Sequence, residues 1–349
     1  MDFNSGMKYI KLTYGGWKKI VFLCTIRVSI DSPKREEKAM NSVLNNKNDS
    51  KDIFKSARRI FGFLKSFRLA HLLSDEIYLK FKYKRKFGKA LNLVNPQGFN
   101  EKMQWLKINN RRPSYTKLVD KYAVKSYIKD VIGEKYLIPL IGGPWEHFDE
   151  INFDSLPDKF VLKCSHDSGG IVICRDKKSL NKMAAKVKIE ESLCRDFYLY
   201  RREWVYKNIP HRIFAEEYVE NTSDEGLHDY KVWCFMGKPV YIQYINGRLK
   251  DVSYEVFFDT DWVAQNFCYH NEILKDKIPK KPERLEELLS IAEILAQGHL
   301  FIRADFYILA DNSIKFGELT FYPNAGLENW HPEEMDKILG DKICIEKDI

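Results

Sequence analysis

The chain has 349 residues, 14% of them aromatic and 30% charged, which excludes a wholly disordered protein and leaves room for two or three packed subdomains. Its seven cysteines contain no Cys-x-x-Cys pair and its eight histidines show no metal-ligand spacing, so we expect free thiols in a reducing cytoplasm and no zinc site. Residues 1–112 carry 25 Lys and Arg against 9 Asp and Glu, whereas the remainder carries 32 against 40. This basic third of the chain either contacts an anionic membrane surface or glycan, or is a solubilising face. Nucleic acid is not an expected partner.

Residues 1–52 have the pattern of a basic N-terminal extension that ends in a polar linker, residues 31–52. The most apolar early run, residues 20–26, is far shorter than the roughly 20 residues that span a bilayer. Beside Trp17, Lys18 and Lys19, this run either lies on a membrane surface or docks as a short strand or helix. We therefore expect a cytoplasmic protein, with peripheral contact at the cytoplasmic face of the membrane as one option.

Residues 53–135 are predicted to form a helical N-terminal subdomain. Apolar residues recur at helical spacing over residues 54–87, which indicates two basic amphipathic helices, and further helices are predicted at residues 101–108 and 115–131. In the last of these, Lys121 and Lys125 lie four residues apart on one face. Two lysines on one helix face usually mark a solvated surface.

Residues 136–211 are predicted to form a small subdomain around a strand, a small-residue loop and a second strand at residues 158–174. Gly169 and Gly170 in this loop would permit positive φ angles and close approach of backbone N–H groups to an anion, with the charge of Lys163 beside it. Most loops of this kind only connect strands, so phosphate binding is one of two interpretations. An aromatic and basic stretch at residues 195–206 either closes over a substrate or packs.

Residues 212–349 are predicted to form a C-terminal subdomain of strands at residues 212–220, 229–235, 239–246 and 252–258, a helix at residues 282–297 and a final hairpin. On the strand at residues 229–235, Asp229, Lys231 and Trp233 project from one face. The helix leads directly into the hairpin.

The hairpin, residues 301–321, places charged residues opposite one another. If a two-residue turn pairs Ala310 with Ser313, paired numbers sum to 623, so Asp305 lies opposite Glu318 and Arg303 opposite Thr320. Their face continues with four apolar side chains: Tyr307, Leu309, Ile314 and Phe316. Like charges directly opposite are destabilising, so we expect a cation between the carboxylates, and Mg²⁺ suits hard oxygen ligands. The alternative is a solvated hairpin whose acidic pair is neutralised by Arg303.

The order of these features resembles the ATP-grasp superfamily, and more closely its TupA-like branch, which is associated with teichuronopeptide and surface-polysaccharide synthesis. The resemblance covers about residues 83–339 and rests on NP at 95–96, FNEK at 99–102, LVDKYAV at 118–124, YLIPL at 136–140, VLKCSH at 161–166 and GELTFYP at 317–323. It implies an α+β protein with the ATP-grasp fold, in which two α+β subdomains grip a nucleotide, behind a helical and basic N-terminal region.

The resemblance also implies roles for individual residues. Nucleotide contacts are implied for the phosphate lysines Lys125 and Lys163, for the mobile loop with His166, Ser168, Gly169 and Gly170, and for the adenine and ribose strand with Glu216, Glu217 and Val219. Mg²⁺ is implied at Asp305 and Glu318, with either Thr320 or Asn324 in the place where the superfamily commonly has Asn. Arg303 and Lys231 are implied as catalytic residues, Arg303 by stabilising charge on the transferred group.

The implied reaction is that of an ATP-dependent carboxylate–amine ligase with an acyl-phosphate intermediate, which needs ATP and Mg²⁺. Its substrates would be a sugar acid or polysaccharide precursor of a capsule, O-antigen or cell-wall polymer, and an amino compound. A sugar kinase and a glycosyltransferase remain open, although the only Asp-x-Asp candidate for the latter, Asp259-Thr260-Asp261, lies in a predicted turn. A binding module without catalysis is a third class, and the nearly complete set of phosphate, hinge and metal residues argues against it.

Overall fold

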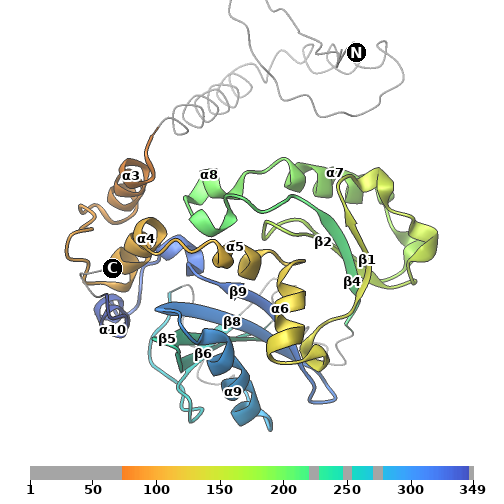
Figure 1. The fold of residues 1–349 in the computed structure, drawn as a ribbon. Helices are drawn as coiled ribbons and strands as arrows, with labels where there is room; N and C mark the ends of the chain where they lie inside the picture. The colour runs from red at the N-terminus through yellow and green to blue at the C-terminus, as the bar shows by residue number, and fades with distance from the viewer. Residues whose placement is uncertain (1–72, 220–227, 247–253, 270–277, 346–349) are drawn as a thin grey trace, which may run out of the picture. The chain divides into compact units, whose positions relative to one another are not determined.

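The computed structural model describes residues 73–219, 228–246, 254–269 and 278–345, which belong to one unit of the chain, Arg68–Ile349 (Figure 1). The predicted extension, its linker and the first basic helix lie outside the described residues. The helices are α3 (Asp75–Phe87), α4 (Phe99–Asn109), α5 (Ser114–Val119), α6 (Val124–Val131), α7 (Lys182–Leu193), α8 (Phe197–Arg201), α9 (Leu285–Ala296) and α10 (Met335–Asp341). The strands are β1 (Leu140–Trp145), β2 (Phe160–Cys164), β3 (Ile171–Cys174), β4 (Ile213–Glu217), β5 (Asp229–Phe235), β6 (Lys238–Asn246), β7 (Tyr254–Phe258), β8 (Phe301–Ile308) and β9 (Ile314–Thr320); two 3-10 turns matter below, η5 (Trp204–Tyr206) and η7 (Pro323–Gly326).

The helix predicted over residues 115–131 is interrupted at Asp120, and α5 and α6 flank the break. The Asp120 carboxylate accepts hydrogen bonds from the backbone N–H groups of Tyr122 (2.9 Å) and Ala123 (3.0 Å), as an aspartate that begins a helix commonly does. The backbone N–H of Lys121 donates to the carbonyl of Ser165 at 3.0 Å. The break therefore separates Lys121 from the helix that carries Lys125 and brings it beside the loop after β2.

The first sheet has four antiparallel strands in the order β1-β4-β2-β3. Helix α7 packs against β2 and β3, and the core between them is built from residues such as Phe160, Leu162 and Ile189. Strand β4 lies inside this sheet because both of its edges are paired, one with β1 and the other with β2. The strand predicted at residues 212–220 therefore belongs to the first sheet, and the second sheet begins with β5.

The second sheet has five antiparallel strands in the order β7-β6-β5-β8-β9, and α9 packs against β5, β6 and β8 (Figure 1). Alternate residues of β8, among them Ile302, Ala304 and Phe306, are fully buried in the main core. The residues between them, Arg303 and Asp305, face the other side of the sheet. One face of the sheet thus holds the hydrophobic core, and the other presents charged side chains.

The β8–β9 hairpin has the predicted register at the carboxylates, with Asp305 opposite Glu318 and Arg303 opposite Thr320. The turn differs from the prediction: the N–H of Leu309 donates to the carbonyl of Ser313 at 2.9 Å around a three-residue loop. A bulge then adds one residue to β9 between the positions opposite Asp305 and Phe306. The longer turn and the bulge each shift the pairing by one residue, and the two shifts cancel.

The bulge changes which side chains share the face of the carboxylates. Phe316 pairs with Phe306, and both are buried in the main core together with Ile314. The prediction that Ile314 and Phe316 continue the carboxylate face is therefore wrong, because one extra residue reverses the alternation of β9. Tyr307 and Gly317 occupy that side of the hairpin instead.

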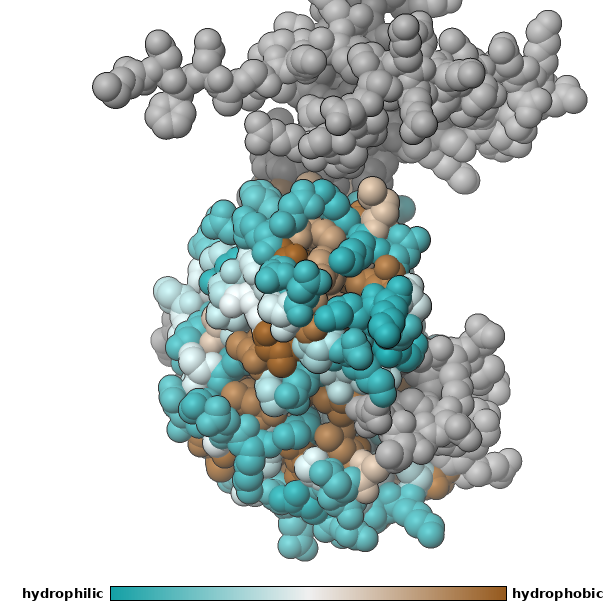
Figure 2. Space-filling model, turned by 90° about the vertical axis from the view of Figure 1, so that its right-hand side faces the viewer, coloured by the Kyte–Doolittle hydropathy of each residue, from teal (hydrophilic) through white to brown (hydrophobic). Residues whose placement is uncertain are grey.

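Hydrophilic side chains cover most of the molecular face seen in Figure 2, with apolar side chains in scattered groups between them. Such scattering is ordinary for a folded domain. None of the described helices is long and apolar enough to cross a membrane.

Candidate active site

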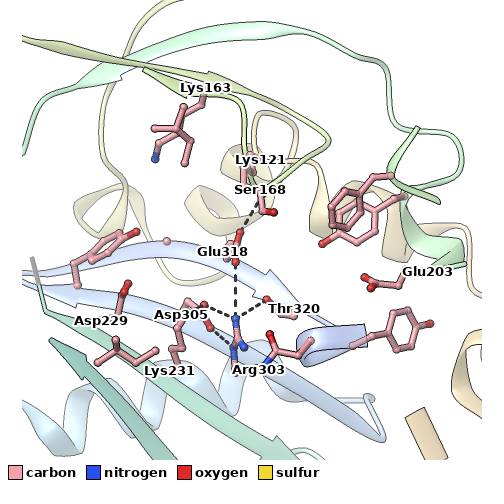
Figure 3. A pocket seen from close by; sticks show the side chains of 18 of the residues that line it. Lys121, Lys163, Ser168, Glu203, Asp229, Lys231, Arg303, Asp305, Glu318 and Thr320 are labelled. Atoms are coloured by element: carbon pink, nitrogen blue, oxygen red, sulfur yellow. Dashed lines mark hydrogen bonds and ion pairs between the residues drawn. The ribbon is translucent and has the colours of Figure 1, made fainter. Parts of the chain in front are cut away.

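A cavity of about 350 Å³ lies between the two sheets (Figure 3). The first sheet contributes Lys163 and Glu216, and the charged face of the second sheet contributes Lys231, Asp305 and Glu318. The lining is dominated by charged and aromatic side chains drawn from segments far apart in the sequence. The cavity is therefore suited to a charged ligand that touches both sheets.

The centre of the cavity is a charge cluster on β5 and β8. Arg303 donates two hydrogen bonds to Asp305, from Nε to Oδ1 and from an η nitrogen to Oδ2, both at 2.7 Å, and that η nitrogen also donates to Thr320 Oγ1 at 3.1 Å. Lys231 forms a second ion pair with Asp305, because the register of β5 and β8 places the two residues directly opposite. Arg303, Asp305 and Lys231 are each at least 93% buried. The cations that neutralise Asp305 thus come from the protein itself.

Glu318 is the more accessible of the two opposed carboxylates, with 34% of its side chain exposed. Lys121 lies 3.1 Å from one carboxylate oxygen, and Arg303 lies 3.9 Å from the other. Burial alone would favour the neutral acid, but the charges of Lys121, Lys231 and Arg303 hold the pKa of Glu318 well below its usual range. Glu318 is therefore an ionised carboxylate that faces the cavity and has oxygen atoms suited to bind a cation.

On the first sheet, Glu216 binds two lysines at once. One of its oxygens lies 2.5 Å from Lys125 Nζ and the other 2.5 Å from Lys163 Nζ, and Lys125 also donates to the carbonyl of Ile138 at 2.9 Å. Although burial opposes ionisation of Glu216, the two ammonium groups lower its pKa. Only Lys163 and Glu216 of this triad line the cavity. The two lysines predicted at phosphate thus meet at a carboxylate predicted at adenine.

The Gly loop contributes less to the cavity than predicted. Ser168 lines it, whereas His166 is buried, stacks on His211 with ring centroids 3.6 Å apart, and contacts the carbonyl of Ser192 through Nε2 at 3.1 Å. Neither Gly169 nor Gly170 has a positive φ. A Cβ at Gly170 would lie 2.2 Å from the hydroxyl oxygen of Ser192 on α7, so close packing explains that glycine.

Two residues of the predicted adenine strand lie elsewhere. Glu217 and Val219 line a separate hollow of about 380 Å³ together with Pro139 and Lys315. Glu217 points away from Glu216 because successive residues of a strand face opposite sides. The structure thus places Glu216 in the main cavity and its neighbours outside it.

Residues 101–344 match the family model described as TupA-like ATPgrasp, which covers well over half of the chain. The chain belongs to the TupA-like ATP-grasp family. No curated protein matches it. Membership in this family agrees with the α+β architecture of two antiparallel sheets and the helices that pack on them.

Several solved structures resemble the chain weakly. They include the L-amino acid ligase from Bacillus licheniformis (14% identity, TM-score 0.42, covering 78% of this chain and 62% of that one), the D-alanine–D-alanine ligase from Bacillus anthracis complexed with ATP (17%, 0.36, 65% and 65%) and the N5-carboxyaminoimidazole synthetase from Staphylococcus aureus complexed with ADP (12%, 0.38, 72% and 61%). The chain spans less than two thirds of the length of each of these proteins. The family assignment does not depend on them.

The hairpin of this ATP-grasp chain and the η7 turn after it carry oxygen ligands of the kind that Mg²⁺ prefers. Asp305, Glu318, Thr320 and Asn324 all line the cavity. Within the described residues no group of three His, Cys, Asp or Glu side chains could hold a metal by itself. A set of two carboxylates and a neutral oxygen still fits Mg²⁺, which usually keeps several waters and substrate phosphates among its ligands. Glu318 would be the principal ligand, since Arg303 and Lys231 already occupy Asp305.

Five residues with charged side chains in this ATP-grasp cavity were not among the predicted site residues: Lys121, Arg201, Glu203, Asp229 and Glu255. The sequence predicts Lys121 on a solvated helix face, because no Gly or Pro between residues 115 and 131 signals the break at Asp120. Asp229 shares the face of Lys231, which the alternation of β5 does indicate. Glu203 lies between α8 and η5 in a segment without periodicity, and no local pattern marks it.

Proposed function

We propose that the chain is an ATP-dependent carboxylate–amine ligase that acts in the synthesis of a surface polysaccharide. The observation that carries this proposal is the convergence of four cations from separate elements on one cavity: Lys121, Lys163, Lys231 and Arg303. Two of them neutralise Asp305, and Lys121 holds Glu318. A site of this kind accommodates a polyphosphate next to a second anion, as the attack of a carboxylate on ATP requires.

In the proposed reaction, ATP turns a carboxylate into an acyl phosphate and an amine then displaces phosphate. Lys163, 19% exposed at its side chain, and Lys121 would bind phosphate oxygens. Arg303, held in place by Asp305 and Thr320, would stabilise the negative charge that develops on the transferred group, as would the nearby Lys231. Mg²⁺, held by Glu318 and Asp305 with Thr320 or Asn324, would supply further charge neutralisation.

The proposed role in polysaccharide synthesis is based on the net charge of the N-terminal third of the chain. Residues 1–112 have a net charge of +16, which suits an anionic glycan or its lipid-phosphate carrier at the cytoplasmic face of a membrane. The carboxyl substrate would then be a sugar acid or a polysaccharide precursor.

The glycosyltransferase alternative is disfavoured by the local structure of its only Asp-x-Asp. Asp259 uses one carboxylate oxygen to accept from the backbone N–H groups of Asp261 (3.0 Å) and Val263 (2.8 Å), and the other to accept from Gln265 (3.1 Å). These bonds form a side-chain-capped turn, in which Asp259 has a structural role. The kinase alternative is tested by the reaction products, because a kinase transfers the γ-phosphate to the sugar and releases no free phosphate.

The test supplies ATP, Mg²⁺, a sugar acid such as glucuronate and a panel of amino compounds. We expect the acid and the amine together to stimulate release of ADP and free phosphate in equal amounts, and hydroxylamine to trap a hydroxamate. A phosphate monoester is inert to hydroxylamine. Transfer of label from γ-labelled ATP to the sugar, without hydroxamate, would refute the ligase and establish a kinase.

A further inference from the structure

One side of the cavity is built by the segment from α8 to η5 and by η7, not by the sheets. Arg201, Glu203 and Tyr206 come from the former and Asn324 from the latter. Figure 3 shows Glu203 across the cavity from Lys163 and Asp229, with its carboxylate turned toward the interior. This side holds none of the predicted phosphate residues.

Within the described residues, Glu203 is a carboxylate without an ion-pair partner. Its residue is 3% exposed, and in the described part of the chain its side chain forms no ion pair and its Oε1 has no hydrogen-bond donor. Burial raises the pKa of Glu203, and the charges of Lys107 and Arg201 only partly oppose this. A buried carboxylate in such a position is unfavourable unless another group supplies a donor or a positive charge.

Lys107 does not supply that donor. Its ammonium group, which is fully buried, donates to Gln104 Oε1 at 3.1 Å and to the carbonyls of Arg201 and Ala325 at 3.3 and 2.8 Å. An ammonium group has three N–H donors, so these three acceptors use all of them. The bond to Ala325 also holds that residue at a φ of 61°, beside Asn324 at 48°. Lys107 therefore supports the wall of the cavity and leaves Glu203 available to a ligand.

Two cations near this side of the cavity also lack an acidic partner within the described residues. A smaller hollow of about 180 Å³ shares Arg201 and Asn324 with the main cavity and extends to Lys82 and Tyr200. Within the described residues neither Arg201 nor Lys82 forms an ion pair; Lys82 Nζ lies 5.4 Å from the ring centroid of Tyr200, and Arg201 contacts the same ring at 5.8 Å. A carboxylate and a nearby guanidinium that form no ion pair within the described residues match a ligand that carries both an ammonium group and an anionic group.

We propose that this side of the cavity is the acceptor subsite of the ligase, in which Glu203 binds the ammonium group of an amino acid and takes its proton, while Arg201 binds the carboxylate of the same amino acid. This inference rests on the proposed ligase function and assigns its amine substrate. It gives a role to the aromatic and basic stretch that contains α8.

The proton balance of the step requires a base. A protonated amine carries three N–H protons, and the amide product keeps one of them. The amine nitrogen forms a bond to the acyl carbon as the bond from that carbon to the phosphate oxygen breaks, and the phosphate leaves with the electron pair. One proton passes to Glu203 and the other leaves with the phosphate, which gives a secondary amide, hydrogen phosphate and protonated Glu203.

Binding tests the subsite without any need for turnover. The full chain is titrated with single L-amino acids by calorimetry, with and without ADP and Mg²⁺, for the wild type, Glu203→Gln and the control Glu191→Gln, whose side chain is exposed on α7. We expect at least one amino acid to bind, Glu203→Gln to weaken its binding at least about tenfold, and the control to bind as the wild type does. Absence of binding by every amino acid, or equal binding by Glu203→Gln, would overturn the proposal.

Unfolding separates this role from a structural one. If Glu203 binds a ligand and does not stabilise the fold, the thermal unfolding midpoint of Glu203→Gln should equal or exceed that of the wild type. The substitution removes a buried carboxylate that forms no ion pair within the described residues. A lower midpoint together with unchanged amino-acid affinity would assign Glu203 to the support of Lys107 and overturn the proposal.

Hydroxylamine then separates the role of Glu203 as proton acceptor from the formation of the acyl phosphate. It is largely uncharged at neutral pH and has little need of a base, so hydroxamate formation from glucuronate, ATP and Mg²⁺ should survive in Glu203→Gln, whereas ADP release driven by the amino acid should fall at least about a hundredfold. Equal loss of both activities would overturn the role of Glu203 as base. A wild type that forms no hydroxamate would count against the ligase function, and the binding result would still decide the subsite.

Discussion

The triad of Lys125, Glu216 and Lys163 makes a quantitative prediction. Glu216 is 4% exposed and lies 2.5 Å from each ammonium group, so the substitution Glu216→Gln removes the carboxylate that pairs with both lysines. One amide oxygen can accept a hydrogen bond from one lysine but cannot neutralise either. The variant is left with two positive charges close together, one of them 8% exposed.

The expected loss follows from the burial of the triad. Breaking a buried ion pair by removing one partner lowers the free energy of unfolding by about 3–5 kcal/mol. Lys163 can turn into the cavity, since its side chain is 19% exposed, so we expect the lower end, about 3 kcal/mol. For a domain of this size this corresponds to a fall in Tm of roughly 6–12 °C. Lys163→Met leaves the pair of Lys125 and Glu216 intact and should lower stability by only about 1 kcal/mol.

The assay is thermal and urea unfolding of the full chain, with Glu217→Gln as the matched control because Glu217 is the next residue of β4 and is exposed. Tripolyphosphate should stabilise Glu216→Gln more than the wild type, since Lys163, which lines the cavity, no longer has a carboxylate partner. A loss of less than about 1 kcal/mol would refute the reasoning about burial. Equal stabilisation of both proteins by tripolyphosphate would show that Lys163 does not reach phosphate.

Two further predictions concern Glu318 and His299. Glu318→Gln should keep the fold and lower the free energy of unfolding by about 1 kcal/mol, because Lys121 loses its partner. It should also weaken Mg²⁺-dependent nucleotide binding, measured by calorimetry with and without Mg²⁺. An unchanged Mg²⁺ dependence would contradict the metal role. Burial, followed by the charge of Arg112, lowers the pKa of His299 to about 4, so the folded state binds fewer protons than the unfolded state between about pH 6.5 and pH 4. Stability should therefore fall by up to about 3 kcal/mol as the pH drops through this window, and His299→Phe should lose that part of the slope in urea midpoints; an unchanged slope would show that His299 does not cause it.

The sequence by itself was sufficient for features that depend on local periodicity. Alternation along β5 and β8 placed Lys231 on one face with Asp229, and Arg303 on one face with Asp305, because side chains of a strand alternate whatever the strand pairs with. The predicted pairing of Asp305 with Glu318 is confirmed, although its derivation missed both the longer turn and the bulge. The alternation of side chains thus identified the faces of the strands. The errors in the predicted turn and in the pairing of β9 amount to one residue each.

Only the tertiary structure decided which charged residues meet. Lys121 enters the cavity because Asp120 interrupts a helix and the backbone N–H of Lys121 bonds to the loop after β2, a contact between residues 44 positions apart. Within the described residues Glu203 has no ion-pair partner, because Lys107 donates to Gln104 and to the carbonyls of Arg201 and Ala325. Such contacts depend on how the whole chain packs, and the residues next to Lys121 and Glu203 are not enough to predict them.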